Sequence, residues 1–349
     1  MPVNDRDYAL VVGINHYPNY GSQGRPLKGA IGDAEDFHRW LLDPDTGGGL
    51  PAANCQLIRS SIATVDPPQP KKARIDEALE TIWNASKSTG ARRLYFYFSG
   101  HGQTQTHDDV ALCMSNWAIN RQAAAISFRK YLDFIVECTA FEEIVMLMDC
   151  CRSRKIGARG QETELTCPLP DAGSPKIFVA HATGFQTTAH EAVTGVLTAD
   201  NEPLVRGHFT RALMAGLQGS AARGLGGVTV SGLALFLKKV VPRIAKRSQH
   251  EQEPQPEMRN FVPGGPDEPV LGAATRVETV DVTIHFTAAR TSRIRLDDPR
   301  ARPIRVGEAS TGPWEETLEA ATHLLTDLET GEEMPLKLQE FAGEAEIEF

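Results

Sequence analysis

The chain has 349 residues, 41% of them hydrophobic and 23% charged, which suffices for a packed core in one large or two unequal domains. The longest apolar runs, such as 144–148, are strand-sized and too short to span a bilayer, and the polar N-terminus lacks a signal-peptide stretch. A net charge of −9 disfavours binding to nucleic acid. We therefore expect a cytoplasmic protein with no membrane or nucleic-acid partner.

The first 240 residues alternate short apolar runs with helical patterns, which is typical of a βαβ sheet. In chain order, the pattern predicts a strand at 8–14, a helix at 30–42, a strand at 55–59, a helix at 72–87, a strand at 93–98, a helix at 127–138, strands at 143–148 and 176–182, and helices near 207–217 and 229–247. These elements predict an α/β domain over residues 1–270.

The remainder of the chain has a different pattern. Residues 248–275 contain several Pro and Gly and are interpreted as a connector. Beyond 276 the apolar residues alternate with polar ones, at 277–286, 293–296, 334–338 and 345–349. This alternation predicts a small β-rich accessory domain at 276–349, whose role stays open and which could receive an activator.

The six cysteines form no C-x-x-C pair and show no zinc spacing with histidine, so we expect free thiols and no metal. Two reactive residues follow predicted strands: His101 after 93–98 and Cys151 after 143–148. The carboxyl ends of parallel neighbouring strands meet at one edge of a sheet, where active sites of α/β proteins lie. A Cys–His pair there makes a nucleophile, and the N–H groups of Gly102 and Cys151 are candidate oxyanion donors.

A histidine in a loop, or a buried cysteine, usually has a structural role when it occurs alone. A histidine and a cysteine that each follow one of two neighbouring strands favour a catalytic role. A phosphatase is excluded because no Cys-x5-Arg exists.

The motifs Tyr-Phe-Ser-Gly-His-Gly (97–102) and Leu-Met-Asp-Cys-Cys-Arg-Ser (147–153) together resemble the caspase and metacaspase superfamily. The fifty residues from His101 to Cys151 match the caspase interval. The segments 8–17, 27–37 and 207–213 also resemble the family, and the resemblance covers about 5–270.

The resemblance implies a caspase-like three-layer sandwich with a mostly parallel sheet of about six strands. It also implies a cysteine endopeptidase that forms an acyl-enzyme through a Cys–His dyad. The triplet 149–151 (Asp-Cys-Cys) has the metacaspase form, so the resemblance assigns Cys151 as the nucleophile and Cys150 as a packed neighbour. One departure is Arg-Ser-Arg at 152–154, where metacaspases usually have His-Ser-Gly.

The metacaspase likeness further implies cleavage after Arg or Lys, with Asp33 and Asp149 binding the cation and Ser99 lining the same pocket. The structural alternatives to cation binding are that Asp33 caps a helix and that Asp149 ends a strand. Three functional alternatives stay open: a peptidase with Asp specificity, a silent scaffold that acts by binding, and another thiol hydrolase or transferase.

Basic specificity makes the exposed basic segment after the nucleophile a candidate for self-cleavage, at Arg154, Lys155 or Arg159; a solvated loop is the alternative. Calcium activates several metacaspases, and Asp108 and Asp109 could belong to such a site. We expect no calcium site here, because the further acidic ligands that a hard cation needs are missing. The resemblance also suggests a role in stress or defence, including a pore-forming substrate.

Overall fold

The computed structural model describes residues 4–21, 24–60, 66–104, 106–138, 141–154, 159–167, 174–197, 203–222, 227–272, 279–287, 290–298, 301, 303–338 and 344–349. The chain divides into two compact units. The first comprises Met1–Ala192 and Arg206–Thr275, and the second comprises Val193–Val205 and Arg276–Phe349. Within the described residues, no helix combines the length and apolar character that crossing a membrane requires.

The first unit is built on a six-stranded sheet in the order β13-β9-β7-β3-β1-β2. Its strands are β1 (Asp7–Gly13), β2 (Cys55–Arg59), β3 (Arg93–Ser99), β7 (Glu143–Asp149), β9 (Lys176–His181) and β13 (Gln255–Arg259). All neighbours pair in parallel except β13, which is antiparallel to β9. The predicted mostly parallel sheet of about six strands is confirmed.

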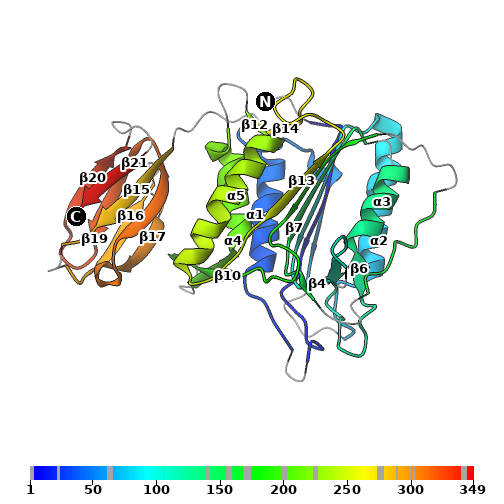
Figure 1. Ribbon diagram of the computed structural model, residues 1–349, viewed down its shortest axis with the longest axis horizontal. Helices are drawn as coiled ribbons and strands as arrows, with labels where there is room; N and C mark the ends of the chain where they lie inside the picture. Colours follow the sequence, from blue (N-terminus) through cyan, green and yellow to red (C-terminus); the bar gives the residue numbers. More distant parts are fainter. Residues whose placement is uncertain are drawn as a thin grey trace. The chain divides into compact units, whose positions relative to one another are not determined.

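Helices cover both faces of this sheet (Figure 1). The helices α1 (Ala30–Leu42), α4 (His208–Ala215) and α5 (Val230–Arg247) cover one face, and α2 (Lys72–Thr89) and α3 (Phe128–Cys138) cover the other. Successive strand residues belong to opposite cores: Val11 and Tyr97 pack with α1, α4 and α5, whereas Val12 and Phe96 pack with α2 and α3. Burial on both faces explains why these strands are continuous apolar runs in the sequence.

Residues 248–275 are more than a connector, so that interpretation was wrong. They contain β13 and also β14 (Val270–Gly272), which pairs with β12 (Val228–Thr229). The sequence of β13 is Gln-Pro-Glu-Met-Arg, which has no apolar run. A proline and polar side chains are tolerated there because β13 is an edge strand, paired only with β9.

A second, smaller sheet in the order β6-β5-β4-β8 lies beside the strand ends. Its strands are β4 (Gly102–Thr104), β5 (Ala111–Cys113), β6 (Ala125–Ser127) and β8 (Ser153–Arg154). Two or three residues are too few for a periodic pattern, so these strands were not predicted. The hairpin β10 (Glu191–Leu197) and β11 (Pro203–Gly207) was missed as well. Short turns of 3-10 or π helix lie at Ala52–Asn54, Gly216–Ser220 and Ala309–Thr311.

The second unit is β-rich, as predicted, and contains two sheets around one core. The orders are β18-β15-β21 and β17-β16-β19-β20. The strands are β15 (Thr279–His285), β16 (Arg293–Asp297), β17 (Pro303–Glu308), β18 (Trp314–Glu319), β19 (Thr322–Asp327), β20 (Glu333–Lys337) and β21 (Glu344–Glu348). Val280, Ile294 and Trp314 lie in the core between them. The sequence had predicted the strands near 277–286, 293–296, 334–338 and 345–349 but not β17, β18 or β19.

Candidate active site

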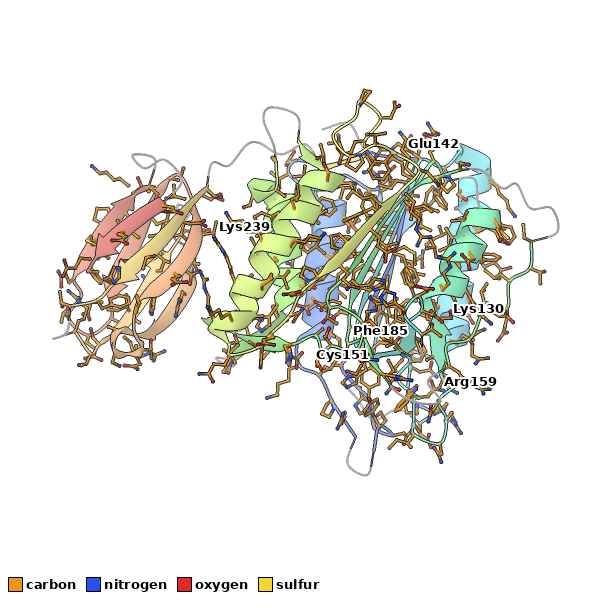
Figure 2. The ribbon with its side chains drawn as sticks, in the orientation of Figure 1. Lys130, Glu142, Cys151, Arg159, Phe185 and Lys239 are labelled. Atoms are coloured by element: carbon orange, nitrogen blue, oxygen red, sulfur yellow. The ribbon has the colours of Figure 1, made fainter. Side chains whose placement is uncertain are left out.

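The pairing of β3 with β7 brings the two predicted reactive residues to one edge of the sheet. Ser99 is in register with Asp149, and the N–H of Gly100 donates to the Asp149 carbonyl over 3.2 Å. His101 and Cys151 follow these positions, and both line one cavity of about 420 Å³. Figure 2 shows Cys151 at the end of β7 opposite to Glu142, which precedes that strand.

The imidazole of His101 is oriented by a backbone carbonyl and two tyrosines. Its Nε2 lies 2.8 Å from the carbonyl oxygen of Arg25. A carbonyl only accepts, so Nε2 carries the proton and Nδ1 of the neutral ring is left as an acceptor. The ring of Tyr20 stacks on the imidazole at 4.8 Å and the ring of Tyr17 lies 4.6 Å from it, while the Tyr17 hydroxyl accepts the backbone N–H of His101 over 2.9 Å. Burial lowers the pKa of His101, so the ring is neutral at pH 7.

The Cys151 thiol is half-buried in the same cavity and donates to the carbonyl of Ala189, with Sγ 3.4 Å from the oxygen. Burial raises the pKa of Cys151, so the resting group is a thiol and needs a base. The neighbouring Cys150 is buried at 2% exposure, and burial raises its pKa well above the ordinary value. Cys150 is therefore the more inert of the two thiols.

Gly102 lies where a side chain would not fit. A Cβ built at this position would lie 2.4 Å from the Cys151 carbonyl oxygen and 2.6 Å from the Cys150 Sγ. Gly102 also lines the cavity, as the first residue of β4. The close approach keeps the backbone after His101 against the backbone around Cys150 and Cys151.

Two buried carboxylates lie in the same cavity as Cys151 and His101. Asp33, on the first turn of α1, accepts the N–H of Gly207 over 3.1 Å and the hydroxyl of Ser99 over 3.4 Å. Asp149 accepts the N–H and the hydroxyl of Thr210 over 3.1 and 2.6 Å. A Cβ on Gly207 would lie 2.3 Å from Asp149 Oδ2 and 3.0 Å from Asp33 Oδ2, so the two carboxylates flank this glycine.

Their environment makes these carboxylates reluctant to ionise. Burial raises the pKa of Asp33 well above its ordinary value, and the charge of Asp149 raises it further. Burial likewise raises the pKa of Asp149, to about 6, against the opposing hydrogen bonds from Thr210. Arg206 is the nearest cation, with its Nε 3.8 Å from Asp33 and 2.6 Å from Asp36. A cation that enters between Asp33 and Asp149 would favour the ionised form of both carboxylates.

Several residues of the cavity were not predicted. Glu191 supplies a third carboxylate, which accepts the N–H of Gly29 over 2.7 Å and of Lys28 over 2.9 Å at the start of α1. It is the first residue of β10, a strand that the sequence pattern did not predict. Gly207 and Thr210 lie in a segment already noted for its family likeness, 207–213. Tyr20 also lines the cavity, from the loop between β1 and α1, and was not predicted.

Asp109 has a structural role. Its carboxylate accepts the hydroxyl of Ser127 over 2.8 Å and the N–H of Arg129 over 3.0 Å, at the start of α3. Asp108 is exposed and lies beside His107. Within the described ranges, no three His, Cys, Asp or Glu side chains are grouped so as to hold a metal ion.

The three candidate self-cleavage residues differ in their surroundings. Arg154 is exposed in β8 and lines the cavity. Lys155 lies outside the described residues. Arg159 is exposed (Figure 2), but the next residues are held: Gly160 packs on Ser127, and Gln161 exchanges two backbone hydrogen bonds of 2.8 Å with β6.

Comparison with known families decides the class of this site. The family model described as the caspase domain matches residues 6–262. The chain belongs to the caspase-domain family. This membership makes the first unit a caspase-like cysteine-peptidase domain, whose substrates are proteins or peptides. The caspase-like fold expected from the sequence is thereby confirmed. A search of curated proteins gives no match.

Proposed function

We propose that this caspase-domain protein is an endopeptidase that cleaves after Arg or Lys with a dyad of Cys151 and His101. The observation that carries the proposal is the presence of two buried carboxylates, Asp33 and Asp149, in the cavity that also contains the thiol and the imidazole. A guanidinium or ammonium group entering between them gains charge-assisted hydrogen bonds and removes their mutual repulsion.

In this mechanism Nδ1 of His101 takes the thiol proton, because Nε2 is already committed to the Arg25 carbonyl. The thiolate attacks the carbonyl carbon of the scissile bond, and the N–H groups of Gly102 and Cys151 stabilise the oxyanion. The imidazolium then protonates the leaving amine, and a thioester remains on Cys151. A water deprotonated by His101 attacks the thioester, which releases the new carboxylate and restores the thiol.

The thiol must first leave its bond to the Ala189 carbonyl, which is 3.4 Å from Sγ in the resting state. A bound peptide excludes water from the cavity and strengthens every electrostatic interaction in it. Substrate binding and thiol activation are therefore coupled in this proposal.

The alternatives make different demands on the cavity. Asp specificity would place a third acid beside Asp33 and Asp149, which Coulomb repulsion opposes. A catalytically silent scaffold acts only by binding. It would not need a cavity that contains both a thiol and an imidazole whose proton is held on Nε2. An acyl transferase would use the same dyad with an amine in place of water. Four further expectations remain predictions: an activator that acts through residues 276–349, a pore-forming substrate, a role in stress or defence, and activity that does not depend on calcium.

Active-site titration tests the proposal. A peptidyl arginyl chloromethyl ketone should alkylate Cys151 stoichiometrically, as located by peptide mass spectrometry, and should abolish hydrolysis of an arginyl reporter peptide. Cys151→Ala should lose both reactions, whereas Cys150→Ala should keep both at a stability cost of about 1 kcal/mol. Alkylation at Cys150, or an active Cys151→Ala protein, would refute the assignment. Equal rates with an aspartyl reporter would refute the specificity.

A further inference from the structure

The cavity has charges of opposite sign on its two sides. The carboxylates Asp33 and Asp149 contact α1 and the start of α4, on one face of the sheet. Two arginines that line the same cavity, Arg25 and Arg154, belong to the other side, around His101 and the small sheet. Both arginines are exposed, and within the described residues neither guanidinium is paired with a carboxylate. Unpaired cations at the rim of a cleft are available to a ligand.

Arg25 lies beside the catalytic imidazole. Its guanidinium carbon is 5.3 Å from the centroid of the Tyr20 ring, and that ring stacks on His101 at 4.8 Å. Its charge also lowers the pKa of Cys151, against the larger effect of burial, which places the guanidinium within electrostatic reach of the sulfur.

Arg154 reaches the same side of the cleft through the small sheet. It lies three residues after Cys151 in β8, opposite Thr104 of β4. The strand β4 begins at Gly102, directly after His101. The two arginines therefore come to the cavity from the loop after β1 and from the strand after Cys151.

The chemistry of the dyad defines which half of a bound peptide passes the side of the cavity that contains Arg25 and Arg154. The imidazolium must donate its proton to the leaving amine, so the amine-bearing half of the peptide runs next to His101. The P1 side chain occupies the opposite side, between Asp33 and Asp149. Residues on the C-terminal side of the scissile bond consequently pass Arg25 and Arg154.

We propose that Arg25 and Arg154 form a subsite for an acidic side chain at P1′ to P3′, so that the preferred substrate has a basic residue followed closely by Asp or Glu. This inference rests on the proposed function and specifies its substrate class. Both guanidiniums are exposed, so each pairing is modest and screened by salt. We expect Glu to exceed Lys in kcat/KM by about 3- to 10-fold at its best position, and this ratio to fall toward one at high ionic strength.

Internally quenched peptides with a common Arg at P1 and Glu, Gln or Lys at P1′, P2′ or P3′ test the subsite. Charge reversal by Arg25→Glu or Arg154→Glu should bring the Glu-to-Lys ratio to one or below. Lys238→Glu is the matched control, since this exposed lysine of α5 does not line the cavity and the change in net charge is the same. It should keep the wild-type ratio.

The outcomes separate the two proposals. Cleavage after Arg with equal rates for Glu and Lys peptides overturns the subsite and leaves the proposed function intact. A Glu preference that persists unchanged in both Arg25→Glu and Arg154→Glu also overturns the subsite. No cleavage of any peptide by wild-type protein overturns the proposed function and the subsite with it.

Discussion

Ser99 and Asp149 are register partners at the ends of the neighbouring parallel strands β3 and β7. His101 and Cys151 each lie two residues beyond this pair, and the bond from the Gly100 N–H to the Asp149 carbonyl extends the pairing past the strands. The sheet thus fixes where the backbones of His101 and Cys151 lie, and Asp149 is both the last residue of β7 and part of the wall of the same cavity.

Removing one charge from the pocket should lower activity and raise stability. Asp33→Asn eliminates the repulsion from Asp149 but also a partner of the P1 cation, so we expect kcat/KM for an arginyl reporter to fall about 100-fold or more. Thermal unfolding should show a gain in stability at pH 7, because burial and the charge of Asp149 raise the pKa of Asp33 and the variant has no carboxylate there to ionise. Asp36→Asn is the control, since Asp36 is on the same helix and outside the cavity. Retained arginyl activity in Asp33→Asn would remove Asp33 from the pocket.

The pocket should make substrate binding dependent on pH. Protonated Asp149 cannot pair with a guanidinium, so KM for the arginyl reporter should rise as the pH falls through about 6, the pKa to which burial raises this group. Its contribution to stability has the opposite sign. The folded state binds the proton more tightly than the unfolded state, so this contribution increases as the pH falls from about 6 toward 3.8.

Steady-state kinetics and melting curves between pH 5 and 8 check this prediction. Titration of His101 acts on kcat once substrate is bound, so a pH-dependent KM distinguishes the pocket from the dyad. A KM that stays constant across this range contradicts the assignment of Asp149.

Tyr17 should act as a positioning residue for the imidazole. Its hydroxyl accepts the backbone N–H of His101 over 2.9 Å and donates to the Cys113 carbonyl over 3.2 Å, and its ring lies 4.6 Å from the imidazole. Tyr17→Phe removes both of these hydrogen bonds, so we expect a loss of about 1–3 kcal/mol in stability, a lower kcat and an unchanged KM. Tyr131→Phe is the control: it also loses a buried hydrogen bond, to Asp76, but Tyr131 lies on α3 and does not line the cavity. If kcat is equal in the two variants, Tyr17 contributes to stability only and does not position the imidazole.

Gly102 should tolerate no side chain. In Gly102→Ala the new Cβ meets the Cys151 carbonyl at 2.4 Å, so the nucleophile loop must shift. A shift of this size misplaces the thiol and the oxyanion donors, and we expect at least about a 100-fold loss of kcat. Gly272→Ala, whose Cβ would meet only ordinary contact at 3.5 Å, is the control. A folded Gly102→Ala protein with wild-type kcat would show that the close approach is not needed.

Self-cleavage, if it follows from basic specificity, should occur at Arg154 or Lys155 rather than at Arg159. A scissile segment must be extended in the cleft, and the residues after Arg159 are held by packing on Ser127 and by two hydrogen bonds of Gln161. Intact mass spectrometry of purified protein, with Cys151→Ala as the control, measures this. Fragments ending at Arg159, or an intact and active wild-type chain, would contradict the prediction.

The sequence alone determined the parallel sheet and the two reactive residues at its edge, because apolar runs of strand length and the motifs that follow them are local signals. Asp33 and Asp149 came from family resemblance, and their function as a pocket remains a proposal. Only the tertiary structure decided which groups surround them. Gly207, Glu191 and the Arg25 carbonyl reach the cavity, and Thr210 binds Asp149, from loops and from the ends of helices and strands. The local sequence pattern of such segments does not indicate their long-range contacts. The edge strand β13 was not predicted, because a strand that is paired on one side only needs no apolar run.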